Sequence, residues 1–122
     1  MVQTGTATWY GKGFHGHTTA SGEVYNMNAL TAAHVSLPMN TLVRVTYPRT
    51  GRSIVVRIND RLPAFVDCVI DLSAKAAEFL GLKRRGAGTV RLAYLAKGEA
   101  KGAAPRLAAR QPRRLVMLAL KK

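Results

Sequence analysis

Residues 41–58, TLVRVTYPRTGRSIVVRI, decide the fold, because two runs rich in β-branched residues flank the turn-forming segment PRTG. Side chains of a strand alternate between its two faces, so Val43, Val45 and Tyr47 share one face while Leu42 and Arg44 share the other. A Pro and a Gly between two such runs are typical of a β-hairpin. We therefore predict that a β-hairpin lies near the middle of the chain.

Further short strands and one helix are predicted around this hairpin. Residues 5–10, GTATWY, and residues 88–95, GTVRLAYL, read as strands. Between them, Ser73 is a suitable N-cap for a helix with the sequence AKAAEFL, whose apolar residues form one stripe, and Gly81 ends it. Several short strands with one helix predict a mainly β fold, a small closed barrel, because closure leaves no exposed strand edge.

The length and composition indicate one domain followed by a basic tail. A chain of 122 residues corresponds to a single domain, which we place at residues 4–96. The tail, residues 97–122, is rich in Pro, Ala and Arg, and it carries eight Lys or Arg residues against the single acid Glu99. Residues 97–114 contain too few large apolar side chains to order themselves, so we expect a linker-like segment. The final LVMLAL segment fits either a docked strand or a short helix.

The net charge of +13 and the pI near 11.0 call for a polyanionic partner. Nucleic acid, an anionic membrane surface and an acidic cell-wall polymer all qualify. We expect no nucleic acid, because the sequence has neither a recognition helix nor the aromatic and basic sheet pattern of nucleic-acid binders. No apolar run is long enough to cross a membrane, and the first residues do not resemble a signal peptide, so we expect the targeting segment to be absent from this chain. Cys68 is the single cysteine, which excludes an internal disulfide.

The six acidic residues deserve individual attention in so basic a chain. Glu23 lies in a polar loop, and Asp60 lies between Arg57 and Arg61 in RINDRLPAF, residues 57–65. Each has a structural interpretation, as a solvated loop acid or as an ion-pair partner. Together they suit glycosidic cleavage, which needs a proton donor and often a second carboxylate near the anomeric carbon. Asp71 directly precedes the predicted helix, and we interpret it as a structural residue that caps the helix N-terminus.

Histidine and aromatic residues provide further candidates. His34 ends a small apolar strand, and a lone His in that position is either a packing residue or a functional one. His15 and His17 could share a strand face, but no Cys or carboxylate close in sequence completes a ligand set, so we expect no metal and no cofactor. Trp9 is predicted to belong to the core, whereas Tyr25 suits either the core or a glycan-binding groove.

Four blocks of the sequence resemble the rare lipoprotein A family over about residues 5–95. They are ATWYG at 7–11, TTASGEVYNMNALTAAHVSLPMNTLVRV at 18–45, SIVVRINDRLP at 53–63 and VIDLSAKAAEFLG at 69–81. The resemblance implies a six-stranded double-psi β-barrel with one or two short helices, a fold shared with expansin-like domains. It also implies a lytic transglycosylase, which cleaves peptidoglycan between N-acetylmuramic acid and N-acetylglucosamine and leaves a 1,6-anhydro ring.

The same resemblance implies that Glu23, His34 and Asp60 are the catalytic residues. On this hypothesis Asp60 is the general acid and then the base, which requires an environment that raises its pKa, such as burial. Glu23 would stabilise the positive charge of the transition state or orient the substrate, and His34 would hold one carboxylate by a hydrogen bond. Arg57 and Arg61 should then point away from Asp60, toward substrate.

Tyr25, Arg57 and Arg61 are accordingly our candidate substrate-binding residues. The expected partners are peptidoglycan glycan strands, including strands that lack stem peptides, which some members of the family prefer. The resemblance further suggests a monomer located in the periplasm or elsewhere in the cell envelope. The alternative from another functional class is a non-catalytic module that binds the cell wall through the same barrel.

The sequence departs from the family pattern at four positions. Leu62 and Ala64 stand where the family usually has a Gly and an aromatic residue, and Cys68 stands where Arg is frequent. Leu resists backbone conformations that Gly permits, so the loop at Leu62 is expected to differ in path or exposure. Asn40 replaces a Gly, which is a mild change because Asn tolerates the left-handed backbone region.

Overall fold

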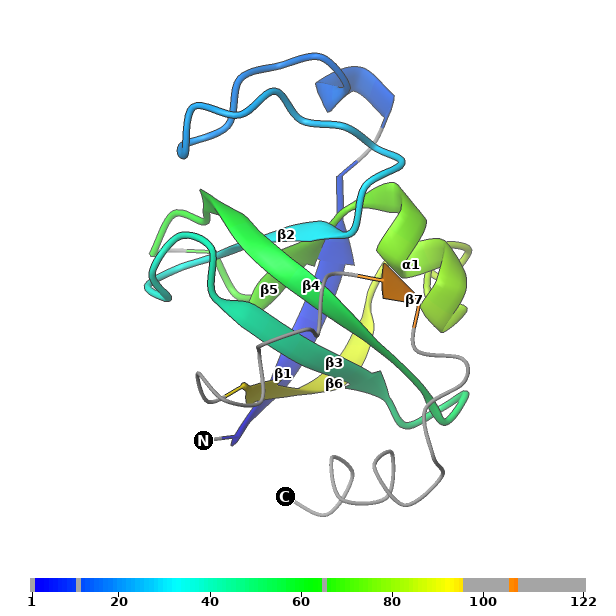
Figure 1. Ribbon diagram of the computed structural model, residues 1–122. Coiled ribbons are helices and arrows are strands. Elements are labelled where there is room, and N and C mark those ends of the chain that lie inside the picture. Colours follow the sequence, from blue (N-terminus) through cyan, green and yellow to red (C-terminus); the bar gives the residue numbers. More distant parts are fainter. Residues whose placement is uncertain (1, 11, 65, 96–105, 108–122) are drawn as a thin grey trace.

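The computed structural model of the chain describes residues 2–10, 12–64, 66–95 and 106–107 (Figure 1). These residues form seven strands, one α-helix and one turn of 3-10 helix. In chain order they are β1 (Val2–Trp9), η1 (Lys12–Phe14), β2 (Thr31–His34), β3 (Leu42–Tyr47), β4 (Arg52–Arg61), β5 (Ile70–Leu72), α1 (Ala74–Leu80), β6 (Gly88–Tyr94) and β7 (Arg106–Leu107).

Six of the strands close into a barrel. They are hydrogen-bonded in the order β2-β5-β1-β6-β3-β4, and β4 pairs back onto β2. The pairs β1–β5 and β2–β4 are parallel, and the remaining pairs around the barrel are antiparallel. The predicted mainly β barrel of six strands is therefore confirmed, and so is the expectation of one or two short helices.

The long strand β4 has two partners along one edge. Its carboxyl-terminal half, from Arg57 to Arg61, pairs with β2, whereas Ile54 and Val55 pair with the two residues of β7. Arg106 and Leu107 lie within residues 97–114, for which a linker-like segment is predicted, and the rest of that segment lies outside the described residues. The LVMLAL segment lies outside the described residues.

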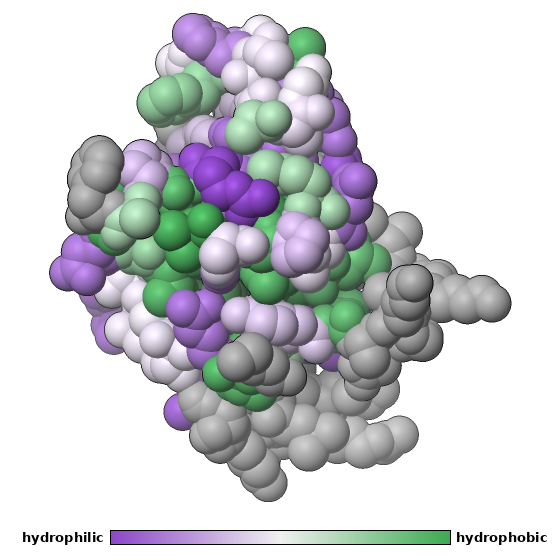
Figure 2. All heavy atoms as spheres, turned by 90° about the vertical axis from the view of Figure 1, so that its left-hand side faces the viewer, coloured by the Kyte–Doolittle hydropathy of each residue, from purple (hydrophilic) through white to green (hydrophobic). Residues whose placement is uncertain are grey.

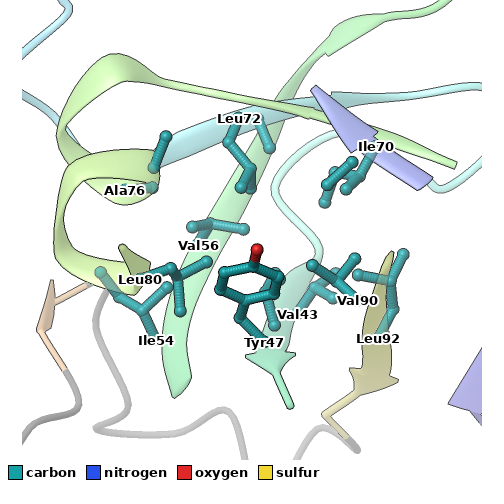
Figure 3. Packing of buried hydrophobic residues seen from close by; sticks show 14 of the residues in the cluster. Val43, Tyr47, Ile54, Val56, Ile70, Leu72, Ala76, Leu80, Val90 and Leu92 are labelled. Carbon is teal, nitrogen blue, oxygen red and sulfur yellow. The ribbon is translucent and has the colours of Figure 1, made fainter. Parts of the chain in front are cut away.

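The barrel interior holds the apolar face of the predicted hairpin. Val43, Val45 and Tyr47 are all buried, in agreement with the alternation of the sequence. Figure 3 shows side chains from the hairpin, from β5, from β6 and from α1 meeting in one cluster, with the Tyr47 ring near its centre. Gly88 permits this arrangement, because a Cβ atom there would lie only 2.8 Å from Cε1 of Tyr47.

Helix α1 closes one side of the barrel and has the predicted ends. The Ser73 side chain accepts a hydrogen bond from the backbone N–H of Ala76, as an N-cap does. Gly81 adopts the left-handed conformation, with φ of 83°, and its N–H bonds back to the last turn. The buried residues of α1 face the barrel, so this helix fixes the position of β5, which immediately precedes it.

Candidate active site

A row of side chains crosses four adjacent strands on the outer surface of the barrel. Ala33 of β2 pairs with Asp60 of β4 on one side and with Asp71 of β5 on the other, and Asp71 pairs with Thr8 of β1. Side chains of paired residues point to the same face of a sheet. Thr8, Asp71, Ala33 and Asp60 therefore form one row, although they are distant in the sequence.

This row faces away from the barrel core and lies at the end over which the loop between β1 and β2 arches (Figure 1). The neighbouring residue Ala32 pairs with Ile58 and Leu72, and all three are fully buried in the core cluster. Alternation then directs Ala33 and its partners outward. Figure 2 shows that strongly hydrophilic side chains lie between apolar ones across one face of the molecule.

A β-bulge in β4 directs two consecutive polar side chains toward this end of the barrel. The register shifts between Ala32 and Ala33, so Asn59 is left without a paired residue between Ile58 and Asp60. Bulges of this kind re-aim side chains next to functional sites. Asn59 is buried and donates to a carboxylate oxygen of Glu23 at 3.0 Å.

Asp60 is a half-buried acceptor of three hydrogen bonds. The Tyr10 hydroxyl donates to Oδ2 at 2.8 Å, and the backbone N–H groups of Ala20 and Arg61 both donate to Oδ1 at 2.9 Å. A carboxylate has about four acceptor positions, so one position on Oδ2 is left for a substrate group. This environment suits a group that accepts hydrogen bonds.

The catalytic hypothesis requires that the guanidinium groups of Arg57 and Arg61 do not bind Asp60, and neither of them does. Arg57 donates through both terminal nitrogens to Glu23 and through one of them to Asn40 at 3.0 Å. Arg61 donates instead to two backbone carbonyl oxygens, at the end of β2 and in the loop after it, at 3.1 and 2.7 Å. The two arginines thus hold protein groups in place.

Glu23 is an ionised residue that joins the overarching loop to the barrel. The Arg57 guanidinium and then the Asn59 amide, as hydrogen-bond donors, lower the pKa of Glu23 to about 2. The loop is also fixed by the hydrogen bond from the Ser21 N–H to the Asn59 carbonyl oxygen. Glu23 in the loop is therefore held against β4 at Asn59, the residue before Asp60. Its carboxylate remains charged at neutral pH.

His34 does not hold a carboxylate, contrary to the hypothesis from the sequence. It is 2% exposed, and its Nδ1 accepts hydrogen bonds from the backbone N–H groups of Ser36 and Leu37. Nε2 therefore carries the proton and donates to the side-chain oxygen of Gln3 at 3.1 Å. Burial and the nearby charge of Arg61 lower the pKa of His34, so the ring is a neutral anchor for the loop after β2.

Tyr25, our candidate substrate-binding residue, lies inside the protein rather than at its surface. The Tyr25 side chain is 2% exposed, and its hydroxyl accepts a hydrogen bond from the Ala74 N–H. Its ring stacks on that of Tyr10 with 4.5 Å between centroids. Tyr25 therefore supports Tyr10, whose hydroxyl reaches Asp60, and the exposed Phe14 packs edge-on against the other side of Tyr10.

Asp71 does not cap the helix, because Ser73 fills that role. Its carboxylate accepts a hydrogen bond from the Thr8 hydroxyl at 3.0 Å, and that hydroxyl also lies 3.8 Å from the Cys68 sulfur. Burial is the main cause that raises the pKa of Asp71 to about 6; the nearby Asp60 adds to the rise and Thr8 opposes it. No local sequence pattern indicates this environment, since Thr8 is 63 residues away.

Two positions at which the sequence departs from the family pattern, Leu62 and Asn40, have clear structural consequences. Leu62 is buried with Tyr10, Tyr25 and Ala33 in a small cluster beneath the site. Asn40 has φ of 73°, in the left-handed region, as its tolerance for that region allows. Its side-chain oxygen also binds Arg57, a contact that a glycine could not make.

The described residues also limit other kinds of site. Within residues 2–10, 12–64, 66–95 and 106–107, no three His, Cys, Asp or Glu side chains lie together in a way that could hold a metal ion. His15 is engaged by the Met27 N–H at 3.1 Å. The helices in these ranges are too short to cross a membrane.

Comparison with known structures supports the fold. A Streptomyces papain inhibitor matches with a TM-score of 0.63 and 24% identity, over 79% of this chain and 96% of the inhibitor. A Clavibacter michiganensis expansin matches with a TM-score of 0.64 and 21% identity, over 80% of this chain and 52% of the expansin. These likenesses show the expansin-like barrel and nothing of its activity.

Comparison with known sequences shows the family. The family model described as lytic transglycolase matches residues 2–94. A Synechocystis protein named probable endolytic peptidoglycan transglycosylase RlpA is 56% identical over 91 residues, which are 75% of this chain and 28% of that protein. The Neisseria meningitidis serogroup A endolytic peptidoglycan transglycosylase RlpA is 46% identical over 99 residues, 81% of this chain and 41% of that protein. This chain thus spans well under half the length of these relatives. The chain belongs to the rare lipoprotein A family of lytic transglycolases, and its residues 2–94 form the double-psi β-barrel of that family.

Proposed function

We propose that this barrel is an endolytic peptidoglycan transglycosylase that cleaves the bond between N-acetylmuramic acid and N-acetylglucosamine. The muramyl 6-hydroxyl displaces the leaving sugar in place of water, so the product carries a 1,6-anhydro ring. The names of the relatives support this substrate and reaction. The positive charge of the chain favours an anionic glycan polymer.

The observation that carries the proposal is the environment of Asp60. Its carboxylate lies at the outer surface of the barrel with one free acceptor position, and neither flanking arginine neutralises it. The ionised Glu23, which is bound by Asn59, the residue before Asp60, supplies negative charge where the oxocarbenium-like transition state becomes positive. Asp60 and Glu23 are thus our proposed catalytic residues.

The other candidate residues act through the shape of the site. His34 is a positioning residue, because its ring fixes the loop after β2 and contacts no carboxylate. Arg57 and Arg61 border the proposed glycan site and hold Glu23 and that loop, respectively. We place the activity in the cell envelope, and in the periplasm where an outer membrane exists. We propose a monomer acting on strands without stem peptides.

The test is digestion of purified sacculi, intact and amidase-treated, with product masses read by mass spectrometry. The chain should release 1,6-anhydromuramyl products, more from amidase-treated sacculi, and Asp60→Asn should abolish them. Glu78→Gln is the matched control, because this exposed carboxylate lies on helix α1 and its charge change is the same. It should leave the products unchanged.

Other products would contradict the proposal in distinct ways. Reducing-end products would show hydrolysis by water and would refute transglycosylation. Retained binding to sacculi without any product would instead support the non-catalytic wall-binding module.

A further inference from the structure

We propose that Asp71, rather than Asp60, is the proton donor to the glycosidic oxygen. This inference rests on the proposed function and assigns a role within it to a residue that lies outside the Glu23, His34 and Asp60 set. Asp60 then becomes the carboxylate that faces the positive charge at the anomeric carbon.

The first support is the geometry of the barrel. Asp60 and Asp71 pair with the same residue, Ala33, from opposite sides, so both side chains project from one face. Two strand spacings separate their Cα atoms, which corresponds to about 10 Å. Glycoside-cleaving sites use two carboxyl groups that flank the bond at a comparable scale. The residue between them, Ala33, has no polar side-chain group, so Asp60 and Asp71 supply the carboxyl groups of the row.

The aromatic ring of Tyr10 connects the two carboxyl groups. Tyr10 packs against Ala33 in the small apolar cluster and donates its hydroxyl proton to Asp60. Burial and the charges of both aspartates raise the pKa of Tyr10, which shows that it lies near both. Tyr10 is itself buried, with 8% of its surface exposed, so it acts as an apolar spacer between the two carboxyl groups.

The second support is the difference between the hydrogen-bond environments of the carboxyl groups. Asp60 accepts three protein hydrogen bonds, and Glu23 is held by a guanidinium and an amide. Asp71 accepts one side-chain hydrogen bond, from Thr8, and is partly buried. A carboxyl group with few donors and little water is the one that keeps a proton for transfer.

The titration of these groups agrees with that division. The pKa of Asp71 is raised to about 6, mainly by burial, whereas the pKa of Glu23 is lowered to about 2 by Arg57 and Asn59. Near neutral pH a useful fraction of Asp71 is therefore protonated while Glu23 is not. This pairing of a neutral acid with a charged carboxylate is the usual way to separate the two roles.

The step balances without any further reactant. Asp71 gives its proton to the glycosidic oxygen as the bond from that oxygen to C1 of the muramyl sugar breaks. The 6-hydroxyl of the same sugar forms the new bond to C1, and its proton passes to the Asp71 carboxylate. The acid is regenerated, no water is consumed, and Asp60 and Glu23 stabilise the charge throughout.

The experiment measures initial rates on amidase-treated sacculi as a function of pH, with sacculus binding measured in parallel. The titratable groups that face Asp71 are Tyr10 directly after β1, Tyr25 in the overarching loop, Asp60 on β4 and Cys68 before β5. Wild-type activity should fall as pH rises through about 6, where Asp71 loses its proton. Asp71→Asn should lose about 100-fold or more in kcat, the contribution of a general acid, with KM and binding little changed.

Thr8→Val provides an independent readout that a purely structural role would not move. Removing the hydroxyl deletes the hydrogen bond that lowers the pKa of Asp71, so the fall in activity should shift to higher pH. Thr6→Val is the matched control, because Thr6 is exposed two residues earlier on the same face of β1, and its profile should match the wild type.

Each outcome decides the matter. Wild-type kcat in Asp71→Asn, or an unshifted profile in Thr8→Val, would overturn the role of Asp71 while the proposed function stands. If Asp71→Asn does not fold, the Thr8→Val profile alone decides. A wild-type chain that binds sacculi and yields no anhydro product would overturn the proposed function, and this inference with it.

Discussion

Replacing Asp71 with Asn should stabilise the protein at neutral pH and not at acidic pH. The folded protein raises the pKa of Asp71 from 3.8 to about 6, because burial disfavours the charged form. A raised pKa in the folded state contributes stability that is complete below pH 3.8. That contribution is lost as the pH rises through about 6. Asn cannot ionise and still offers an oxygen to the Thr8 hydroxyl.

The magnitude follows from the size of the shift. About two pKa units at 1.36 kcal/mol each correspond to about 3 kcal/mol, which is an upper value because the side chain is partly exposed. The quantity to measure is the free energy of unfolding by urea for wild type and Asp71→Asn, at pH 4 and at pH 7.5. The free energy of unfolding of Asp71→Asn minus that of the wild type should increase by up to about 3 kcal/mol from pH 4 to pH 7.5.

The exposed Glu78→Gln variant changes the net charge equally and controls for overall charge repulsion. Its difference from wild type should stay nearly constant across the same range, since Glu78 faces solvent on α1. If the stabilisation by Asp71→Asn is constant with pH, or shrinks as the pH rises, burial does not raise the pKa of Asp71 and the reasoning is refuted.

Three further changes probe the contacts around the site and core. Arg57→Gln should lower the free energy of unfolding at pH 7 by about 1–2 kcal/mol, because it removes a bidentate ion pair with Glu23. Lys75→Gln removes only the exposed contact of 4.0 Å with Glu78, so it should change the free energy of unfolding by less than about 0.5 kcal/mol. Equal urea midpoints for the two variants would contradict this. Asn40→Val should cost about 1–2 kcal/mol and Asn40→Gly less than about 1 kcal/mol, because a β-branched residue is strained at φ of 73°; thermal denaturation that ranks them in reverse would count against it. Gly88→Ala should cost about 1–3 kcal/mol by crowding the ring of Tyr47, and Tyr47→Leu added to it should restore part of that loss in a double-mutant cycle. Strict additivity would exclude the contact.

The elements that depend on near neighbours in the chain were predictable from the sequence. The hairpin around PRTG and the helix between Ser73 and Gly81 follow from alternation, turn residues and caps. The helix has the expected bounds, whereas β4 of the hairpin continues to Arg61, three residues past the predicted end at Ile58. The resemblance supplied the number of six strands and the double-psi type of barrel. Without it, the residue pattern indicated a small barrel and no strand order.

The candidate site was harder to predict, because its contacts cross between strands. Two residues before Ser73 in the sequence, Asp71 looks like a capping residue, yet its carboxylate contacts Thr8 on a strand that pairs with β5 only in the closed barrel. His34 was expected to bind a carboxylate, whereas its ring turns back to the loop that follows it. Side-chain direction here depends on register and on a bulge, which no local pattern reveals.

The row of Thr8, Asp71, Ala33 and Asp60 has a consequence for how activity arises during folding. Its members come from four strands, and the two parallel pairings that unite them, β1 with β5 and β2 with β4, join segments far apart in the chain. Such long-range pairings carry a large loop-closure entropy and form late in folding. A chain with its hairpin and helix already formed would still have its two carboxyl groups on separate, untethered segments. The proposed catalytic activity should therefore be recovered in the same kinetic phase as the complete barrel, and partly folded molecules should not cleave peptidoglycan.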